Sequence, residues 1–148
     1  TLFCGHSLGG ALAELSAAKL TGKHPNCNLA TFGKPNVFFK GFKRPMELDK
    51  QVSCVHASDF ITTIPRFFYG PSKSQTMLYF SNSGEDHIDP DKAFRKKDRR
   101  LGRIVSDHLM EGYTERLEAF LDNQTTVKKV TAEELQELNK LMDEVENA

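Results

Sequence analysis

The stretch 4–10, with the sequence CGHSLGG, constrains the fold of this chain more than any other feature. It follows a short apolar run, residues 1–4, that is compatible with the end of a buried parallel strand. Where a strand turns directly into a helix the backbone is crowded, so the positions two before and two after the serine, Gly5 and Gly9, are expected to lack side chains. The stretch therefore predicts a strand, a sharp turn that presents the Ser7 hydroxyl as a nucleophile, and a helix.

The predicted helix begins directly after Ser7. Its apolar residues recur at helical spacing: Leu8, Ala11, Leu12, Leu15 and Ala18. The small residues Gly10, Ala11 and Ala13 are expected to let this helix lie close on the sheet. Residues 21–22, Thr-Gly, are expected to end it. At the start of this helix the backbone N–H of Leu8 would face the place where an oxyanion forms beside the serine. The alternative is that Ser7 only caps the helix.

Four stretches resemble the class 3 (fungal-type) triacylglycerol lipases, a family with the α/β-hydrolase fold. They are GHSLGGA at 5–11, TFGKP at 31–35, VHASDFI at 55–61, and the DH pair at 107–108 followed by Tyr113. The resemblance runs to about residue 121. It implies a serine nucleophile on an elbow, a Ser-His-Asp triad and a lipid ester as substrate.

Two further residues are expected to complete that triad. Asp59 follows a strand predicted over 51–57, where this fold carries the acid, and would hold the catalytic imidazole. His108 stands at the predicted start of a helix after a loop and would be the general base. The order Ser7, Asp59, His108 is the order of this fold. The alternative role for Asp59 is a turn residue that bonds its own backbone.

The other histidines are expected to be structural. His56 falls within the predicted strand, so its ring is expected to bond a neighbouring backbone or loop. His24 lies in a turn and His87 in a polar loop predicted over 81–91, where a surface or capping role is usual.

The fold class predicted is α/β: a partial α/β-hydrolase fold from the elbow strand onward, with a mostly parallel sheet, flanking helices and a C-terminal amphipathic helix. Additional strands are predicted over 28–33 and 76–80. Because the nucleophile follows the fifth strand of this fold, residues 1–121 are expected to be the C-terminal part of a lipase-like domain. The loop that supplies a second oxyanion donor would then be missing, and the chain incomplete for activity. Residues 122–148 are predicted to be a polar linker and an amphipathic helix with a capping box at 131–134.

The charges balance, with 20 Lys and Arg against 20 Asp and Glu, so no nucleic-acid partner is expected. The basic run 92–103 is interpreted as a solvated face; the alternative is attraction to anionic lipid headgroups. No apolar run approaches the length of a transmembrane segment.

The three cysteines, Cys4, Cys27 and Cys54, are isolated along the chain and lack metal-ligand spacing, so neither a metal nor a cofactor is expected. Their odd number favours a reducing compartment such as the cytoplasm, although a disulfide between Cys27 and Cys54 stays open. The localisation is otherwise unknown, because a chain that begins inside a fold could not show a signal peptide.

The function expected is hydrolysis of carboxylic esters of lipids, as by an acylglycerol lipase, at a membrane or lipid-droplet surface. Two alternatives stay open: a non-catalytic α/β-hydrolase-like binding module, and a carboxylesterase for soluble esters.

Overall fold

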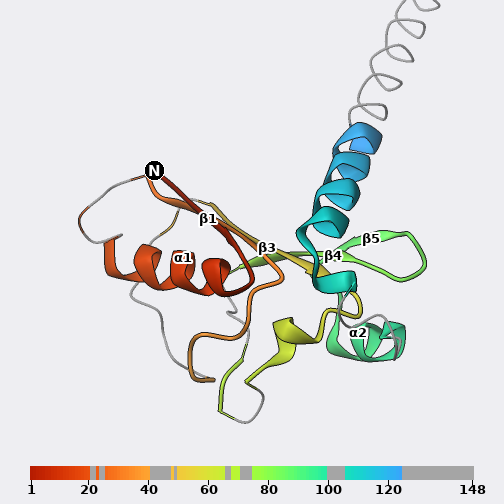
Figure 1. Ribbon diagram of the computed structural model, residues 1–148, viewed down its shortest axis with the longest axis horizontal. Helices are drawn as coiled ribbons and strands as arrows, with labels where there is room; N and C mark the ends of the chain where they lie inside the picture. The colour runs from red at the N-terminus through yellow and green to blue at the C-terminus, as the bar shows by residue number, and fades with distance from the viewer. Residues whose placement is uncertain are drawn as a thin grey trace, which may run out of the picture. The chain divides into compact units, whose positions relative to one another are not determined.

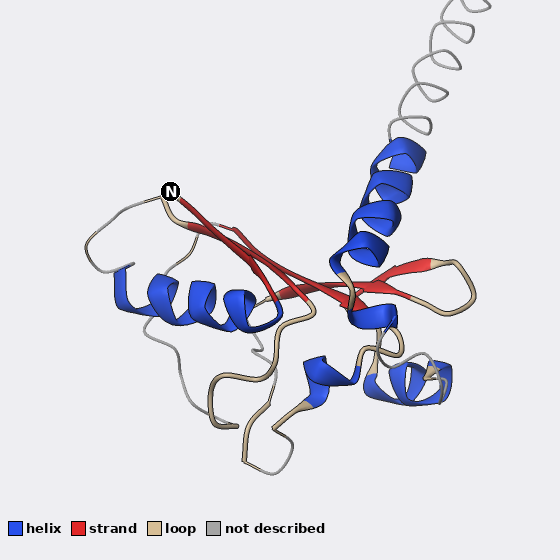
Figure 2. Ribbon diagram, in the orientation of Figure 1, coloured by secondary structure: helices blue, strands red, loops and turns tan. Residues whose placement is uncertain are grey.

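The computed structural model describes residues 1–20, 23, 26–40, 48, 50–65, 68–70, 75–99 and 106–124. The chain divides into two compact units, Thr1–Tyr113 and Thr114–Ala148. The first unit holds these elements in chain order: β1 (Leu2–His6), α1 (Ser7–Leu20), β2 (Asn28–Phe32), β3 (Lys50–His56), the 3₁₀ turn η1 (Phe60–Thr63), β4 (Thr76–Phe80), β5 (Asp86–Ile88), α2 (Lys92–Asp98) and the 3₁₀ turn η2 (Ser106–His108). Figures 1 and 2 show α1 and α2 on the same side of the sheet.

The five strands form one sheet in the order β1-β2-β3-β4-β5. The first four strands are parallel, and β5 runs antiparallel to β4. The register pairs His6 with Phe32 and Phe32 with Cys54, so β1, β2 and β3 end close to one another. The carboxyl ends of parallel strands gather the connections that follow them, and Ser7, Gly33 and Asp59 all lie in those connections.

Helix α1 packs on the sheet through its smallest residues. Ala13 and Ala17 are buried against Leu29 of β2, with Phe3 of β1 at the side of this cluster. This agrees with the close approach expected from Gly10, Ala11 and Ala13, which are buried. Leu8, Leu12 and Leu15 are exposed. Alanine and glycine let the helix axis approach the strands, whereas leucines on that face would hold it away.

Strands β2, β3 and β4 confirm the strands predicted at those places, but β5 was not expected. Gly84, with a φ of 94°, lies in the turn that joins β4 to β5. The antiparallel pairing aligns Leu78 with Ile88. The Ser83-Gly84 pair is the turn signal that the polar composition of this segment obscured.

A second cluster lies over β3 and β4. Val55, Ala57 and Tyr79 form its buried part, and Phe94 of α2 packs against it. The N-terminus of α2 is capped by Asp91, whose carboxylate accepts the Phe94 N–H over 2.7 Å.

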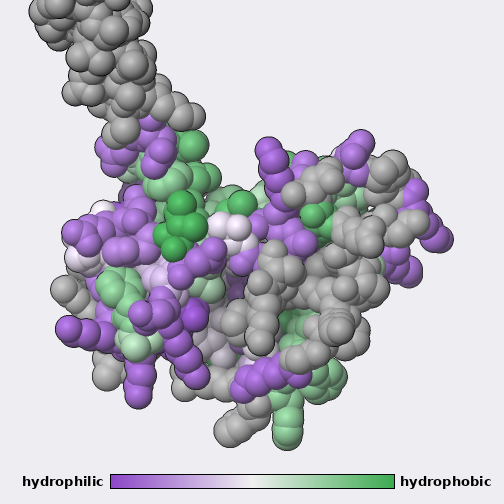
Figure 3. All heavy atoms as spheres, turned by 180° about the vertical axis from the view of Figure 1, so that it is seen from behind, coloured by the Kyte–Doolittle hydropathy of each residue, from purple (hydrophilic) through white to green (hydrophobic). Residues whose placement is uncertain are grey.

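Residues 110–124 are helical, and residues 114–124 are the part of the second unit that the structure describes. Hydrophobic residues, green in Figure 3, lie along one side of this segment and hydrophilic residues along the other. The helix stop predicted at 21–22 and the amphipathic helix predicted after 131 lie outside the described residues. The boundary predicted at 121/122 stays a prediction. None of the described helices combines the length and the apolar character needed to cross a membrane.

Candidate active site

Three side chains that are far apart in the sequence meet at the carboxyl end of the sheet. The Nε2 atom of His108 lies 2.7 Å from the Oγ atom of Ser7. The Nδ1 atom of the same ring lies 2.8 Å from Oδ2 of Asp59. The structure thus brings together the three residues singled out in the sequence, as one continuous chain of hydrogen bonds.

Ser7 is held at a sharp junction between β1 and α1. It is the first residue of the helix and has a φ of 53°, in the left-handed region that residues with a side chain rarely adopt. A Cβ atom on Gly5 would lie 2.4 Å from the carbonyl carbon of Gly9, so only glycine fits at position 5. This crowding holds the serine on a tight turn.

The crowding expected at Gly9 itself is not found. A Cβ atom there would meet nothing within 4 Å among the described residues. The second crowded position is Gly10, where a Cβ atom would lie 2.8 Å from the Gly5 carbonyl oxygen and 2.9 Å from Cβ of Lys34. The helix approaches the strand through its fourth residue, one residue later than the motif spacing suggested.

Asp59 is fully buried just after β3. Its carboxylate caps η1 by accepting the Ile61 N–H over 3.0 Å, through Oδ1. The alternative role as a turn residue is therefore also present, on the other oxygen. Gly33, with a φ of 56°, leaves room for this carboxylate, because a Cβ atom there would lie 2.6 Å from Oδ2.

The hydrogen-bond pattern fixes the tautomer of His108. The carboxylate of Asp59 only accepts, so the ring donates its Nδ1–H to it. The Nε2 atom then carries a lone pair and accepts the hydroxyl proton of Ser7. This arrangement can move a proton from the serine to the ring, and the carboxylate stabilises the imidazolium that results.

Tyr113 is a site residue whose role the sequence did not reveal. Its hydroxyl donates to Oδ2 of Asp59 over 2.6 Å and accepts the backbone N–H of His56 over 3.1 Å. Burial, together with the negative charge of Asp59, raises the pKa of the Tyr113 hydroxyl well above its usual value, so it remains a donor. The position of Tyr113 five residues after His108 was the available signal.

Two further histidines hold the turn that carries His108. The Nε2–H of His6 donates to the His108 carbonyl oxygen over 2.7 Å, and the two rings lie 4.8 Å apart. Nδ1 of His56 lies 3.4 Å from Oδ2 of Asp107, which is itself buried. The prediction that His56 is structural agrees with this contact, but His6 was missed.

Of the two remaining histidines, His87 lies away from the site, and His24 is not among the residues that the structure describes. The ring of His87 lies beside that of Phe94, tilted by 58° with centroids 4.5 Å apart, and is 3.7 Å from the Glu85 carboxylate. Within the described part of the chain, no group of three or more His, Cys, Asp or Glu residues is arranged to hold a metal ion. The three cysteines are free thiols, so the Cys27–Cys54 disulfide is not formed.

The chain is similar in fold to solved fungal lipases. A lipase from Rhizopus microsporus var. chinensis is 21% identical, with a TM-score of 0.53 over 73% of this chain and 42% of that one. The triacylglyceride lipase of Rhizomucor miehei is also 21% identical, with a TM-score of 0.57 over 73% of this chain and 45% of that one. The Rhizomucor miehei lipase in complex with its propeptide is 23% identical, with a TM-score of 0.50 over 59% and 30% of the two chains. This chain therefore spans less than half the length of these lipases.

Sequence comparison finds one family among the matches. No curated protein sequence matches the chain. Residues 1–69, which contain the elbow, Gly33 and Asp59, match the family model of the class 3 lipases. This match covers just under half of the chain, and the chain has the α/β-hydrolase fold.

Proposed function

We propose that this chain carries the catalytic residues of a serine hydrolase that cleaves carboxylic esters of lipids. The observation that carries the proposal is the continuous hydrogen-bond chain from Ser7 through His108 to Asp59, with distances of 2.7 and 2.8 Å. The three groups are arranged as attack by the serine requires.

The reaction proceeds in two stages. The Oγ atom of Ser7 attacks the ester carbonyl carbon while Nε2 of His108 takes the hydroxyl proton, and the carbonyl oxygen becomes an oxyanion. The backbone N–H of Leu8, in the first turn of α1, is the donor proposed for that oxyanion. Collapse breaks the bond to the alcohol, which leaves with the proton from His108.

Water completes the cycle. His108 takes a proton from a water molecule, whose oxygen attacks the acyl carbon and releases the carboxylic acid from Ser7. The proton returns to the serine oxygen, and Asp59 holds the ring in place throughout.

The surroundings of the site support an apolar substrate. Each of the three proposed catalytic residues is followed in the chain by an exposed hydrophobic residue: Leu8, Phe60 and Leu109. Exposed side chains of this size beside a hydrolytic centre provide a surface for an acyl chain. The name of the Rhizomucor miehei triacylglyceride lipase suggests an acylglycerol as substrate.

A fluorophosphonate probe tests whether Ser7 is the nucleophile. We expect the probe to label the protein, to fail to label the Ser7→Ala variant, and to label the Ser16→Ala variant normally. Ser16 is an exposed serine on the same helix and is therefore a matched control. Absence of labelling in the natural protein would instead favour a non-catalytic binding module.

A second assay separates a lipase from an esterase for soluble substrates. Hydrolysis of a short triacylglycerol is measured below and above the concentration at which it forms droplets. A rise in rate at that concentration supports action at a lipid surface, whereas saturation below it supports the esterase.

A further inference from the structure

A cavity that is separate from the proposed catalytic residues lies over β3 and β4. Its volume is about 490 Å³, a size typical of small-molecule sites. Ser53 and Val55 of β3 line it, whereas Ser7, Asp59 and His108 do not. The cavity is on the sheet face covered by α1 and α2, because Ser53 lies beside Thr31, two residues along β2 from the Leu29 that packs on α1.

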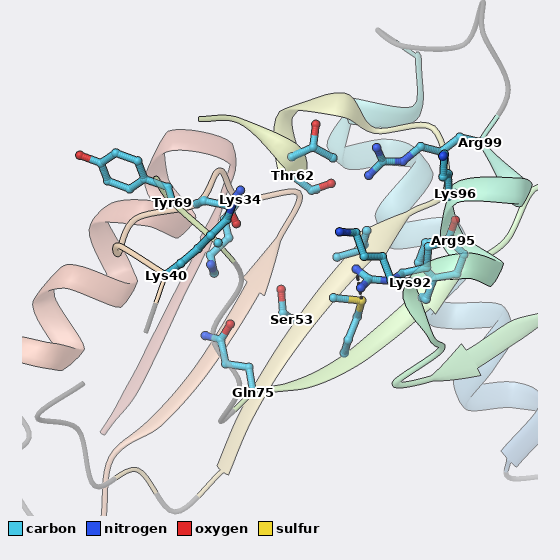
Figure 4. Close-up of a pocket in the computed structure, with 16 residues that line it drawn as sticks. Lys34, Lys40, Ser53, Thr62, Tyr69, Gln75, Lys92, Arg95, Lys96 and Arg99 are labelled. Atoms are coloured by element: carbon cyan, nitrogen blue, oxygen red, sulfur yellow. Dashed lines mark hydrogen bonds between the residues drawn. The ribbon is translucent and has the colours of Figure 1, made fainter. Parts of the chain in front are cut away.

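The lining of this cavity is strongly cationic. Six lysines and arginines line it: Lys34, Lys40, Lys92, Arg95, Lys96 and Arg99. Figure 4 shows Lys34 and Lys40 on one side, the other four on the opposite side, and Ser53 between them. The chain as a whole has 20 basic and 20 acidic residues, so the positive charge is concentrated at this cavity.

Four of the cations come from one short segment. Lys92, Arg95 and Lys96 are in α2, and Arg99 is its C-terminal cap. Their spacing of three, four and seven residues places them on one side of the helix, which faces the cavity. On another side, Phe94 packs against the ring of Tyr79, with centroids 6.1 Å apart, and so fixes the rotation of α2. The basic run 92–103 is therefore not simply a solvated face in its described part.

Two acidic residues near the cavity contact residues of its lining. The buried carboxylate of Glu14 pairs with Lys34 over 2.9 Å. Asp98 accepts a hydrogen bond from the hydroxyl of Tyr79 over 3.1 Å. Among the residues that the structure describes, the lining itself holds six basic residues and no Asp or Glu.

Neutral hydrogen-bonding groups complete the lining. The hydroxyls of Ser53, Thr62 and Thr63 and the side-chain amide of Asn36 are among them. The Arg95 guanidinium is half-buried, with one N–H on the sulfur of Met77 at 3.5 Å. Arginine and lysine together with hydroxyls are the groups that bind phosphate oxygens through charge-assisted hydrogen bonds.

We propose that this cavity is a binding site for a ligand with several phosphate groups, such as an inositol polyphosphate or the headgroup of a phosphoinositide. One phosphate can contact the four cations of one wall, whereas a ligand with several phosphates can also reach Lys40 on the opposite wall, beside the Lys34 that pairs with Glu14. The volume of the cavity accommodates such a ligand. The site does not depend on the hydrolytic activity, because it shares none of the proposed catalytic residues.

Calorimetric titration of the protein with myo-inositol hexakisphosphate tests the proposal. We expect one site, with an affinity that weakens as ionic strength rises, and the same affinity in the Ser7→Ala variant. The double variant Lys92→Gln/Lys96→Gln should bind at least about tenfold more weakly, because it loses two charge-assisted contacts to phosphate.

The matched control is Lys19→Gln/Lys97→Gln, which removes the same charge from α1 and α2 at exposed positions that do not line the cavity. Its affinity should stay within about twofold of the natural protein, since exposed charges at a distance contribute little. No binding at millimolar ligand, or an equal loss in both double variants, would overturn the proposal.

Vesicles distinguish the two sources of the ligand. Phosphatidylcholine vesicles carry either phosphatidylinositol 4,5-bisphosphate or phosphatidylserine at matched charge. Preference for the phosphoinositide, lost in Lys92→Gln/Lys96→Gln, assigns the site to a lipid headgroup. Binding of the soluble ligand alone assigns it to a free polyphosphate. Equal binding to both kinds of vesicle, unchanged in that variant, contradicts a specific site.

Discussion

The Tyr113 hydroxyl and Asp59 are joined by a hydrogen bond of 2.6 Å, on the same carboxylate oxygen that accepts the His108 ring. The carboxylate is buried and also accepts the Ile61 N–H. A buried carboxylate with three donors is both satisfied and fixed in orientation. Tyr113 therefore positions the acid without contacting the serine.

Removing this hydroxyl should cost stability and some activity. We expect Tyr113→Phe to lower the free energy of unfolding by about 1–3 kcal/mol, because a bond to a buried charge is lost and the His56 N–H loses its acceptor. The fall in kcat should be far smaller than the ~10⁴-fold that follows loss of the triad carboxylate. Urea unfolding and ester hydrolysis by Tyr113→Phe and Asp59→Asn measure the two effects. A Tyr113→Phe variant as inactive as Asp59→Asn would contradict a positioning role.

The contact between His56 and Asp107 should affect the rate through the turn that carries His108. Asp107→Asn weakens that pair, whose atoms are 3.4 Å apart, and frees the turn. We expect kcat to fall by about tenfold with little change in KM, since displacements of ~1 Å cost up to ~100-fold. The control is Glu85→Gln, which removes a similar but exposed partner from His87 and should leave kcat unchanged.

The two glycines that flank Ser7 should respond in opposite directions to the same substitution. Gly5→Ala places a methyl group 2.4 Å from the Gly9 backbone and should destabilise the protein by about 3 kcal/mol or more. Gly9→Ala meets no neighbour within 4 Å and lies inside α1, so it should stabilise by about 0.5–1 kcal/mol. Thermal unfolding of the two variants is the measurement, and a destabilised Gly9→Ala would show a contact that the described residues lack.

Alkaline pH should weaken the fold from about pH 9 upward. Burial raises the pKa of the Cys54 thiol to about 12, and burial with the Asp59 charge raises the pKa of Tyr113. A pKa that is higher in the folded state means that the folded protein binds more protons, so stability is full below the unfolded pKa and is lost above it. The free energy of unfolding, measured in urea between pH 8 and 12, should fall less steeply in Cys54→Ala and Tyr113→Phe. Equal slopes in all three proteins would show that these groups do not cause the loss.

The sequence predicted the order of the backbone elements better than it predicted the side-chain contacts. The elbow motif gave the order of β1, Ser7 and α1, because the spacing of glycines around a serine has a steric cause that is local in the chain. The strands before Gly33 and Asp59 could also be predicted from a local signal, because each is a run of β-forming residues. The proximity of Ser7, Asp59 and His108 followed only after the resemblance supplied a fold.

What the sequence missed depends on contacts between distant residues. The small residues of α1 predicted its close approach to the sheet, but the burial of Ala17 against Leu29 depends on where β2 lies. The burial of Glu14 depends on Lys34, twenty residues later, and the roles of His6 and Tyr113 depend on partners over fifty residues away. Periodicity within one element carries no information about such partners.

Gly33, which has a left-handed backbone conformation, limits which substitutions the catalytic site can tolerate. Every other amino acid carries at least a methyl group, and that carbon would occupy space that the Asp59 oxygen fills, with the Tyr113 hydroxyl only 3.0 Å away. Substitution here would displace the acid and its tyrosine at once, although Gly33 takes part in no chemical step. A residue with no functional group is thus as hard to replace as those that react.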